Sequence, residues 1–303
     1  MTTKFRQGFW RLADPKISLA SAASMLLGAA AASAAGPLSA GWLTLTVLGI
    51  VAVEVAKNAS GEVFDWDSGT DLRIRTEDRS PFSGGKRVLV DALLTRRQTW
   101  GIAVGGYLLA AVAGLAIVRW REGGVLWIGV AGLALAFFYH APPLRLSYRG
   151  LGELTVAVCY GPLICAGTYL VQRGAIPTRI VLLALPLGLL IAAFLWINEF
   201  PDYSADALSG KRTLVVRLGR PAAAWTFAGL GMAAALVLAL LPAAGLPPAV
   251  WLGGLAALRY APAARTLVAS PEDTARLVPA QAMTLQAFLL YSLGASVGML
   301  LGG

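Results

Sequence analysis

The stretch NASGEVFDWDSGTD, residues 58–71, places four carboxylates and an asparagine directly after a long apolar segment. A second acidic stretch, NEFPDYSAD at residues 198–206, follows a later apolar segment in the same way. A charged group beside hydrocarbon costs free energy unless a partner compensates it. The pattern therefore predicts that both stretches bind something of opposite charge.

The composition around these stretches is that of an integral membrane protein. The chain has 303 residues, of which 57% are hydrophobic and 14% are charged, whereas a soluble domain is about 25% charged. The net charge of +9 does not indicate a nucleic-acid partner, because the basic residues lie in short loops between apolar runs, as in cytoplasmic membrane loops.

Apolar runs long enough to cross a membrane recur along the whole sequence. A spanning helix needs about 20 mainly apolar residues. This length predicts an all-α, polytopic membrane protein with about nine transmembrane helices around a central cavity, at residues 17–35, 41–62, 100–118, 124–141, 153–172, 179–200, 222–241, 246–266 and 280–301. Two long polar loops, 63–99 and 201–221, interrupt the pattern.

The basic residues predict how the chain lies in the membrane. With the N-terminus inside, about twenty Lys and Arg residues fall in cytoplasmic segments. Outside there remain only Arg119, Arg121, Arg173 and Arg179. This bias is typical of the cytoplasmic side. We expect a protein of the cell membrane whose two acidic stretches face the cytoplasm.

A short internal similarity links the two halves of the chain. FSGGKRVLV, residues 82–90, follows the first acidic stretch, and LSGKRTLVV, residues 208–216, follows the second. We interpret residues 1–303 as a single domain of two pseudo-repeated halves, 17–141 and 153–301, each supplying half of one site.

Spacing places the polar residues of each stretch on one helix face. Asn58, Glu62 and Asp65 stand at i, i+4 and i+7, and Asn198, Asp202 and Asp206 stand at i, i+4 and i+8. In the second stretch, Pro201 should kink or end the helix. In the first, Asp65, Asp67 and Asp71 surround Gly69, which is typical of a helix that ends in a loop.

These residue types fit a magnesium–diphosphate site. Carboxylate and amide oxygens are the ligands that Mg²⁺ prefers, and it commonly binds one or two carboxylates together with substrate phosphates. Nearby cations would bind the remaining phosphate charge, namely Arg79, Lys86, Arg87, Lys211 and Arg212. The alternative is that the carboxylates only pair with loop arginines, each exposed pair contributing at most about 1 kcal/mol. Two matched clusters on one side of a membrane favour the binding site.

The motifs resemble those of the UbiA superfamily of membrane-embedded prenyltransferases, most of all the 1,4-dihydroxy-2-naphthoate polyprenyltransferases. The first stretch is similar to that family's first Asp motif, and the second stretch, with GKRTL at 210–214, is similar to its second. YHAPPLR at 139–145, YRGLGE at 148–153, Arg79 and PFSG at 81–84 resemble further parts of the family pattern. One departure is Gly61-Glu62, where the family usually has Asn-Asp, and Asn58 is the candidate substitute.

The resemblance implies Mg²⁺-dependent transfer of a polyprenyl group from its diphosphate to an aromatic acceptor, with two ions bridging the diphosphate. It implies metal ligands at Glu62, Asp65, Asp71, Asn198, Asp202 and Asp206. It implies diphosphate-binding residues at Asn58, Arg79, Lys86, Lys211 and Arg212. Asp65, Asp202, Tyr139 and Arg145 would take part in catalysis, the last two by placing acceptor and diphosphate.

Several alternatives stay open from the sequence. The leading acceptor is 1,4-dihydroxy-2-naphthoate, in menaquinone synthesis, and the rivals are a hydroxybenzoate, a chlorophyllide, a haem or a glycerol-phosphate lipid. A cation-coupled transporter would instead carry ionisable groups near the middle of its helices, and a non-catalytic scaffold would need no matched Asp clusters. The expected partners are the lipid bilayer and the two substrates, and nothing indicates an obligate protein partner.

Four polar residues have no assigned role. His140 is the only histidine, and without a second one it is a poor candidate for a metal ligand. Gln281 and Gln286 would either bond to neighbouring helices or line the cavity, and packing between helices is favoured. Glu54 either extends the site inward or pairs with Lys57.

Overall fold

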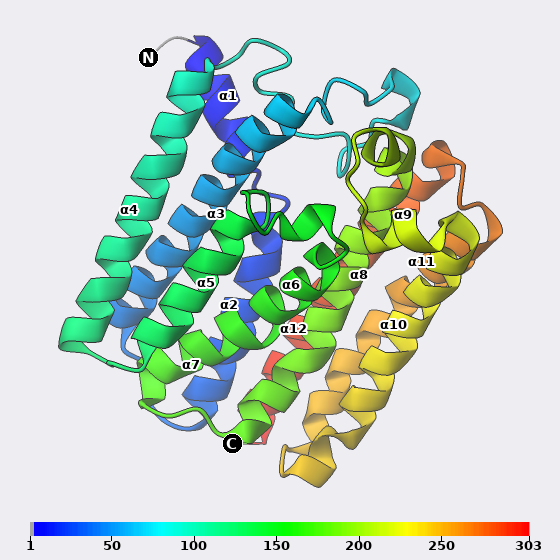
Figure 1. Cartoon of the computed structure of the whole chain (residues 1–303). Coiled ribbons are helices and arrows are strands. Elements are labelled where there is room, and N and C mark those ends of the chain that lie inside the picture. Colours follow the sequence, from blue (N-terminus) through cyan, green and yellow to red (C-terminus); the bar gives the residue numbers. More distant parts are fainter. Residues whose placement is uncertain (1–2, 303) are drawn as a thin grey trace.

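The computed structural model describes residues 3–302, which form a bundle of helices without any strand in that range (Figure 1). The α-helices are α1 Thr3–Ala13, α2 Ser18–Ala34, α3 Ala40–Ser68, α4 Arg96–Trp120, α5 Val125–Phe138, α6 Gly152–Val158, α7 Ile164–Arg173, α8 Thr178–Leu208, α9 Leu214–Leu218, α10 Arg220–Leu240, α11 Ala257–Ala269 and α12 Thr274–Leu301. A π-helical turn, Cys159–Leu163, joins α6 to α7, and a 3-10 helix, Pro248–Ala256, precedes α11. The predicted all-α fold is confirmed.

Six helical segments of the described chain are long and apolar enough to cross a membrane. A seventh forms if α1 and α2, which meet at a bend of 49°, count as one span. Of the other predicted spans, α5 has only 14 residues, and residues 246–266 are divided between the 3-10 helix and α11. The count of nine therefore stays a prediction.

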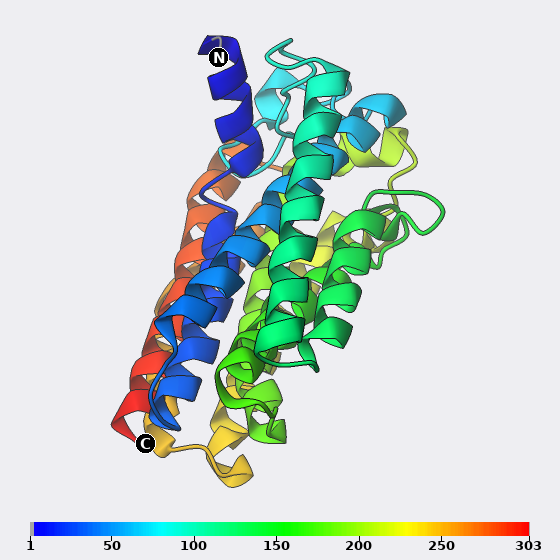
Figure 2. The same ribbon diagram turned by 90° about the vertical axis from the view of Figure 1, so that its left-hand side faces the viewer.

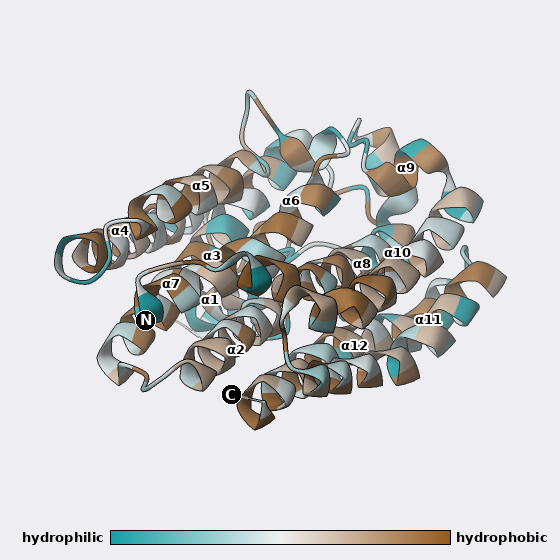
Figure 3. Cartoon of the chain, turned by 90° about the horizontal axis from the view of Figure 1, so that it is seen from below, coloured by the Kyte–Doolittle hydropathy of each residue, from teal (hydrophilic) through white to brown (hydrophobic). Residues whose placement is uncertain are grey.

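The outward faces of the helices are apolar. Large side chains are exposed on α4, such as Leu108 at 61%, and on α10, such as Trp225 at 68%. Figure 3 shows hydrophobic residues along most helices of the bundle. Exposure of such a surface to water would be unfavourable, whereas contact with lipid tails would not. The chain is an integral membrane protein.

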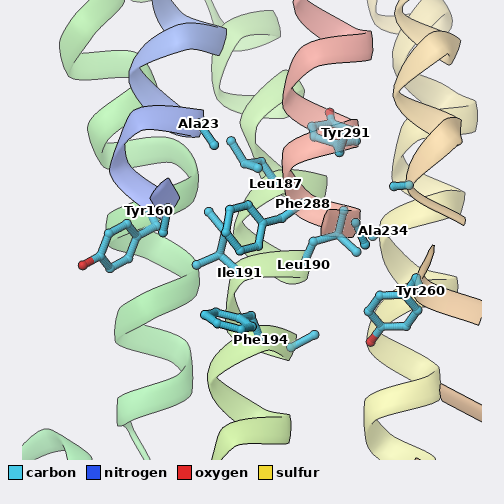
Figure 4. Close-up of a cluster of buried hydrophobic side chains, with 14 of the residues drawn as sticks. Ala23, Tyr160, Leu187, Leu190, Ile191, Phe194, Ala234, Tyr260, Phe288 and Tyr291 are labelled. Carbon is cyan, nitrogen blue, oxygen red and sulfur yellow. The ribbon is translucent and has the colours of Figure 1, made fainter. Parts of the chain in front are cut away.

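Helix α8 lies at the centre of the core and packs against α6, α10 and α12. Leu187 and Ile191 of α8 are buried, and the ring of Phe194 lies 5.6 Å from that of Phe288 on α12 (Figure 4). On the far side of the bundle α12 packs against α2 (Figure 2). These contacts hold α8 rigidly, which positions the carboxylates near its C-terminal end.

Helix α3 ends where the spacing of the first acidic stretch predicted. Gly69 adopts the left-handed conformation with φ 76°, and its N–H donates to the carbonyl of Trp66. Glycine takes this conformation without strain, so it closes the helix and starts the loop. The polar loop thus begins at residue 69 rather than 63, and Glu62 and Asp65 stand on α3 itself.

Helix α8 continues through Pro201 to Leu208. Of the two outcomes expected for this proline, helix termination is wrong. A proline removes one N–H donor, but buried neighbours on both sides, Phe200 and Ala205, pack against the core and sustain the helix. The acidic ends of α3 and α8 lie at the same end of the bundle, together with α1 and α9 (Figure 1).

Candidate active site

Asp65 lies at the centre of the first half of the site. Its Oδ1 accepts a hydrogen bond of 2.8 Å from the hydroxyl of Tyr148, and its Oδ2 lies 3.6 Å from Nε2 of His140. Both partners belong to the segment after α5. Burial lowers the pKa of His140 to about 4, although Asp65 opposes the shift, so the imidazole is neutral at pH 7. Asp65 therefore accepts one hydrogen bond from that segment and lies beside its histidine.

Glu62 stands almost one turn before Asp65 on α3 and is buried. Its Oε1 accepts a 2.8 Å hydrogen bond from the backbone N–H of Leu89. Its Oε2 has no hydrogen-bond partner within residues 3–302. The carboxylate is therefore fixed at one oxygen and free to bind a cation with the other.

Two glycines of the polar loop join the acidic clusters. The N–H of Gly84 lies 3.3 Å from Oδ2 of Asp202, to which it donates. Gly85 has φ +73°, and a Cβ placed on it would lie 2.5 Å from Oδ1 of Asp71. The segment 84–85 therefore contacts Asp71 and Asp202 at once, and only glycine allows the approach at residue 85.

Lys211 is the cation of the second half. Its Nζ lies 3.3 Å from Oδ1 of Asp206, and both side chains are mostly buried. Burial alone would lower the pKa of Lys211, but the carboxylates Asp206, Asp65 and Asp202 outweigh it and raise the pKa well above its usual value. The side chain is therefore charged and interacts with acids from both clusters.

The site as a whole is strongly negative. The pKa of Asp71 is raised well above its ordinary value, first by burial and then by the charges of Asp65 and Glu62. Asp202 adds to this effect, and Lys211 opposes it. An unpaired excess of buried carboxylates is unfavourable unless cations join them.

The residues present fit divalent cations. Several buried oxygens lack a hydrogen-bond partner in the described chain, namely Glu62 Oε2, Asp71 Oδ2, Asn198 Oδ1, Asp202 Oδ1 and Asp206 Oδ2. Within residues 3–302 no three His, Cys, Asp or Glu side chains converge on one point. This donor set suits Mg²⁺, which completes its shell with water and substrate phosphates, better than a metal enclosed by protein alone.

An apolar cavity of about 390 Å³ adjoins the acidic site. Its walls come from α3, α4, α5 and the α6–α7 span, and they include Ile50, Ala110, Leu133 and Leu163. The polar side chains that line part of it include Glu54, Lys57, Tyr139 and Tyr160. The ring of Tyr139 lies 4.8 Å from that of His140, which connects this cavity to Asp65.

Glu54 and Lys57 meet at the cavity through Tyr160. The hydroxyl of Tyr160 donates to Glu54 at 3.1 Å, and the ammonium of Lys57 lies 3.5 Å from the same hydroxyl. Glu54 therefore lines the cavity and is linked to Lys57 through the hydroxyl of Tyr160, and its role in the reaction stays a prediction.

Two residues expected to bind diphosphate have partners outside the acidic clusters. The amide of Asn58 donates to the carbonyl of Leu12 at 2.9 Å, which ties α3 to the end of α1. Asn58 is therefore not the substitute for the amide missing at Gly61. The ammonium of Lys86 pairs with Asp14, while its charge also reaches Glu62, so its contact with diphosphate stays a prediction.

The remaining predicted residues border the site. Arg79, Arg145 and Arg212 are exposed. Arg145 lies over the ring of Tyr148, 5.5 Å from its centroid, and the backbone N–H of Arg212 donates to the carbonyl of Tyr148. In α12, Gln281 is buried without a hydrogen-bond partner among the described residues, and Gln286 is exposed.

Sequence reasoning assigned no role to four residues that the structure places here. They are Tyr148, His140, Glu153 and Glu199. The carboxylate of Glu153 accepts a 2.5 Å hydrogen bond from the N–H of Leu214, which anchors the chain just after Lys211. Tyr148 and Glu153 lie within YRGLGE at 148–153. The resemblance of this segment to the family pattern could have indicated that both residues belong to the site.

Residues 21–298 match the family model described as the UbiA prenyltransferase family. The chain belongs to this family of prenyl-group transferases, and the predicted relationship is confirmed. The transporter and scaffold alternatives are thereby replaced by an enzyme family.

Two curated relatives are about 30% identical to this chain over the aligned residues. A 2-carboxy-1,4-naphthoquinone phytyltransferase of Synechocystis sp. is 31% identical over 178 residues, which cover 58% of this chain and 54% of that protein. The aligned region therefore spans about half the length of that relative. A 1,4-dihydroxy-2-naphthoate octaprenyltransferase of Haemophilus influenzae is 30% identical, over 70% of this chain and 69% of its own.

Solved structures share the fold. A UbiA homologue from Aeropyrum pernix K1 superposes with a TM-score of 0.66 at 18% identity, covering 93% of this chain and 98% of that one. A UbiA homologue from Archaeoglobus fulgidus, bound to GPP and Mg²⁺, superposes with a TM-score of 0.60 at 15% identity, covering 96% and 99%.

Proposed function

We propose that this protein transfers a polyprenyl group from its diphosphate to an aromatic acceptor, with 1,4-dihydroxy-2-naphthoate as the leading candidate. The observation that carries the proposal is the meeting of two acidic clusters, around Lys211 and the Gly84–Gly85 segment, beside an apolar cavity. The Archaeoglobus neighbour bound to GPP and Mg²⁺ supports this type of donor.

The acidic clusters would bind the diphosphate through divalent cations. Glu62, Asp65, Asp71, Asn198, Asp202 and Asp206 remain the proposed metal-binding residues. Bound Mg²⁺ would neutralise the diphosphate charge and make it a better leaving group. Lys211 would bind a diphosphate oxygen directly, because its charge is held among carboxylates of both clusters. Two ions, as the resemblance implies, suit this many acids.

The apolar cavity would hold the prenyl chain. Its volume of about 390 Å³ lies within the range of about 300–1,000 Å³ typical of ligand pockets. Walls of aliphatic side chains exclude water from the reactive end of the chain. The C1–O bond of the donor then breaks, the electron pair leaves with the diphosphate, and an allylic cation remains beside Tyr139, whose aromatic face stabilises positive charge.

The acceptor ring would complete the reaction. A ring carbon forms the new C–C bond to C1 of the prenyl cation, and the ring regains aromaticity by losing a proton or, from a carboxylated carbon, CO₂. No covalent enzyme intermediate is needed. Tyr139 and Arg145 are proposed to place the acceptor and the leaving diphosphate at the edge of the site.

The choice of acceptor rests on the relatives. The Haemophilus relative is named a 1,4-dihydroxy-2-naphthoate octaprenyltransferase, and the Synechocystis relative is named for a carboxylated naphthoquinone. Both names point to a carboxylated bicyclic aromatic ring. We propose that the acidic end faces the cytoplasm at the cell membrane, because most Lys and Arg residues outside the apolar runs belong to the segments at this end.

An acceptor panel tests the proposal. Purified protein receives Mg²⁺, a long-chain prenyl diphosphate, and in separate reactions dihydroxynaphthoate, hydroxybenzoate, chlorophyllide, haem or a glycerol-phosphate lipid. Mass spectrometry of the lipid extract should detect only prenylated naphthoquinol-type product. Prenylation of a different acceptor alone would refute the naphthoate assignment and retain the donor chemistry. Release of diphosphate with no acceptor consumed would refute transfer itself.

A further inference from the structure

The ring of His140 packs directly against Gly61 of α3. Gly61 lies on α3 one helical turn before Asp65, so both positions face the same side of the helix. A Cβ placed on Gly61 would lie 2.7 Å from Cε1 and from Nδ1 of His140. Such an approach is closer than van der Waals contact permits. The imidazole therefore fills the space that a side chain at position 61 would need.

One nitrogen of the His140 ring faces the carboxylate of Asp65. Nε2 of His140 lies 3.6 Å from Oδ2, while the hydroxyl of Tyr148 donates to Oδ1. The distance of 3.6 Å is longer than a hydrogen bond, and contacts of this kind commonly shorten when substrate binds. Asp65 thus has one neighbour for each carboxylate oxygen.

The chemistry of the ring argues against simple packing. Nδ1 of His140 is buried and lacks a hydrogen-bond partner among residues 3–302. An aliphatic side chain would fill the same space without leaving a buried polar atom unsatisfied. A polar ring at this position is explained if it acts on Asp65 or on what Asp65 binds.

We propose that His140, seated against Gly61, is a positioning residue that orients Asp65 toward the metal and diphosphate. In this role the histidine supplies, from the segment after α5, a polar group beside Gly61 of α3, in the space that a side chain there would occupy. The inference rests on the proposed diphosphate site. It assigns no metal bond to the imidazole, because the ring reaches the ligands only through Asp65.

The test measures binding without turnover. Mn²⁺ replaces Mg²⁺, geranyl diphosphate is the donor, no acceptor is added, and electron paramagnetic resonance follows the loss of free Mn²⁺. His140→Leu fills the space and removes the nitrogens, so it should weaken Mn²⁺ binding about tenfold or more, as for other residues that orient metal ligands. His140→Asn, which retains a donor, should weaken binding less.

Two double variants test whether a polar side chain on α3 can replace His140. Gly61→Asn combined with His140→Ser removes the ring and places a short amide on α3, one turn from Asp65, and should restore much of the Mn²⁺ affinity. Gly61→Ala combined with His140→Ser fills the same space without the amide and should not. Thermal unfolding of each metal-free variant reports its folding.

The outcomes distinguish a failure of the role of His140 from a failure of the proposed function. Wild-type Mn²⁺ affinity in His140→Leu, or equal recovery in both double variants, would overturn the role of His140. Failure of the wild-type protein itself to bind Mn²⁺ with geranyl diphosphate would instead refute the proposed function.

Discussion

The ammonium nitrogen of Lys211 lies 3.3 Å from Oδ1 of Asp206, and their side chains are 18% and 2% exposed. The charges of Asp65 and Asp202 reach the same lysine. One cation is thus shared by the ends of two helices whose acidic stretches are more than a hundred residues apart in the sequence. Helices α3 and α8 contribute to one site through this relationship.

Lys211→Met should raise the KM for prenyl diphosphate and lower kcat/KM by about a hundredfold, the magnitude typical of a group that stabilises developing negative charge. Steady-state kinetics with a fixed acceptor measure the effect. Lys4→Met, at an exposed position of α1, is the control and should behave as wild type. An unchanged KM in a folded Lys211→Met protein would exclude Lys211 from donor binding.

Gly85→Ala should impair the site by crowding Asp71. The added Cβ would meet Oδ1 of Asp71 at 2.5 Å, at a φ of +73°. Gly245→Ala carries a similar conformational cost, with φ +83°, but meets nothing within 4 Å. Both variants should lose about 1–2 kcal/mol of stability from the left-handed backbone, measured by thermal unfolding. Only Gly85→Ala should lose Mg²⁺-dependent activity, and equal activity in both would contradict the account.

Gly129→Leu should shorten the prenyl chain that the protein accepts. Gly129 lines the apolar cavity, and no atom lies within 4 Å of a Cβ built there, so the larger side chain fills space rather than displacing neighbours. The ratio of kcat/KM for a C40 donor to that for geranyl diphosphate should fall. Gly101→Leu, on the exposed face of α4, is the matched control. A parallel change in both variants would argue against a chain in this cavity.

Asp202→Asn should abolish most of the activity, whereas Asp67→Asn should leave it unchanged. Asp202 accepts the Gly84 N–H between the clusters, and loss of its charge weakens cation binding. Asp67 pairs with Arg96 at 2.8 Å on the exposed side of α3, and an exposed pair contributes about 1 kcal/mol or less. Product formation at saturating Mg²⁺ measures both. Similar losses in the two variants would mean that total charge, not this site, controls activity.

The acidic faces of α3 and α8 were predictable because they depend on local spacing. The i, i+4 and i+7 positions and Gly69 needed no knowledge of other helices. Asn58 shares that spacing, yet its amide binds the carbonyl of Leu12. Leu12 lies on α1, 46 residues away in the sequence, and no pattern within α3 indicates this contact.

The contacts between distant segments could not be predicted, because they depend on how the chain folds and not on local spacing. Gly61 looked like a departure from the family pattern, and its meaning appears only when His140 is seen against it. Gly84 and Gly85 were noticed as part of a repeat, but their contacts with Asp202 and Asp71 depend on how the loop folds back. Similarly, the ion pair between Lys86 and Asp14 joins residues 72 positions apart, and no local pattern predicts it.

The central claim is that both acidic clusters bind one diphosphate through divalent cations. Calorimetry of geranylgeranyl diphosphate binding, with no acceptor, tests it most directly in wild-type protein, Asp65→Ala and Asp202→Ala, each with Mg²⁺ and with EDTA. The account predicts binding by the wild-type protein only with Mg²⁺ and its loss in each single variant. Equal binding in EDTA, or wild-type affinity in both variants, would contradict it.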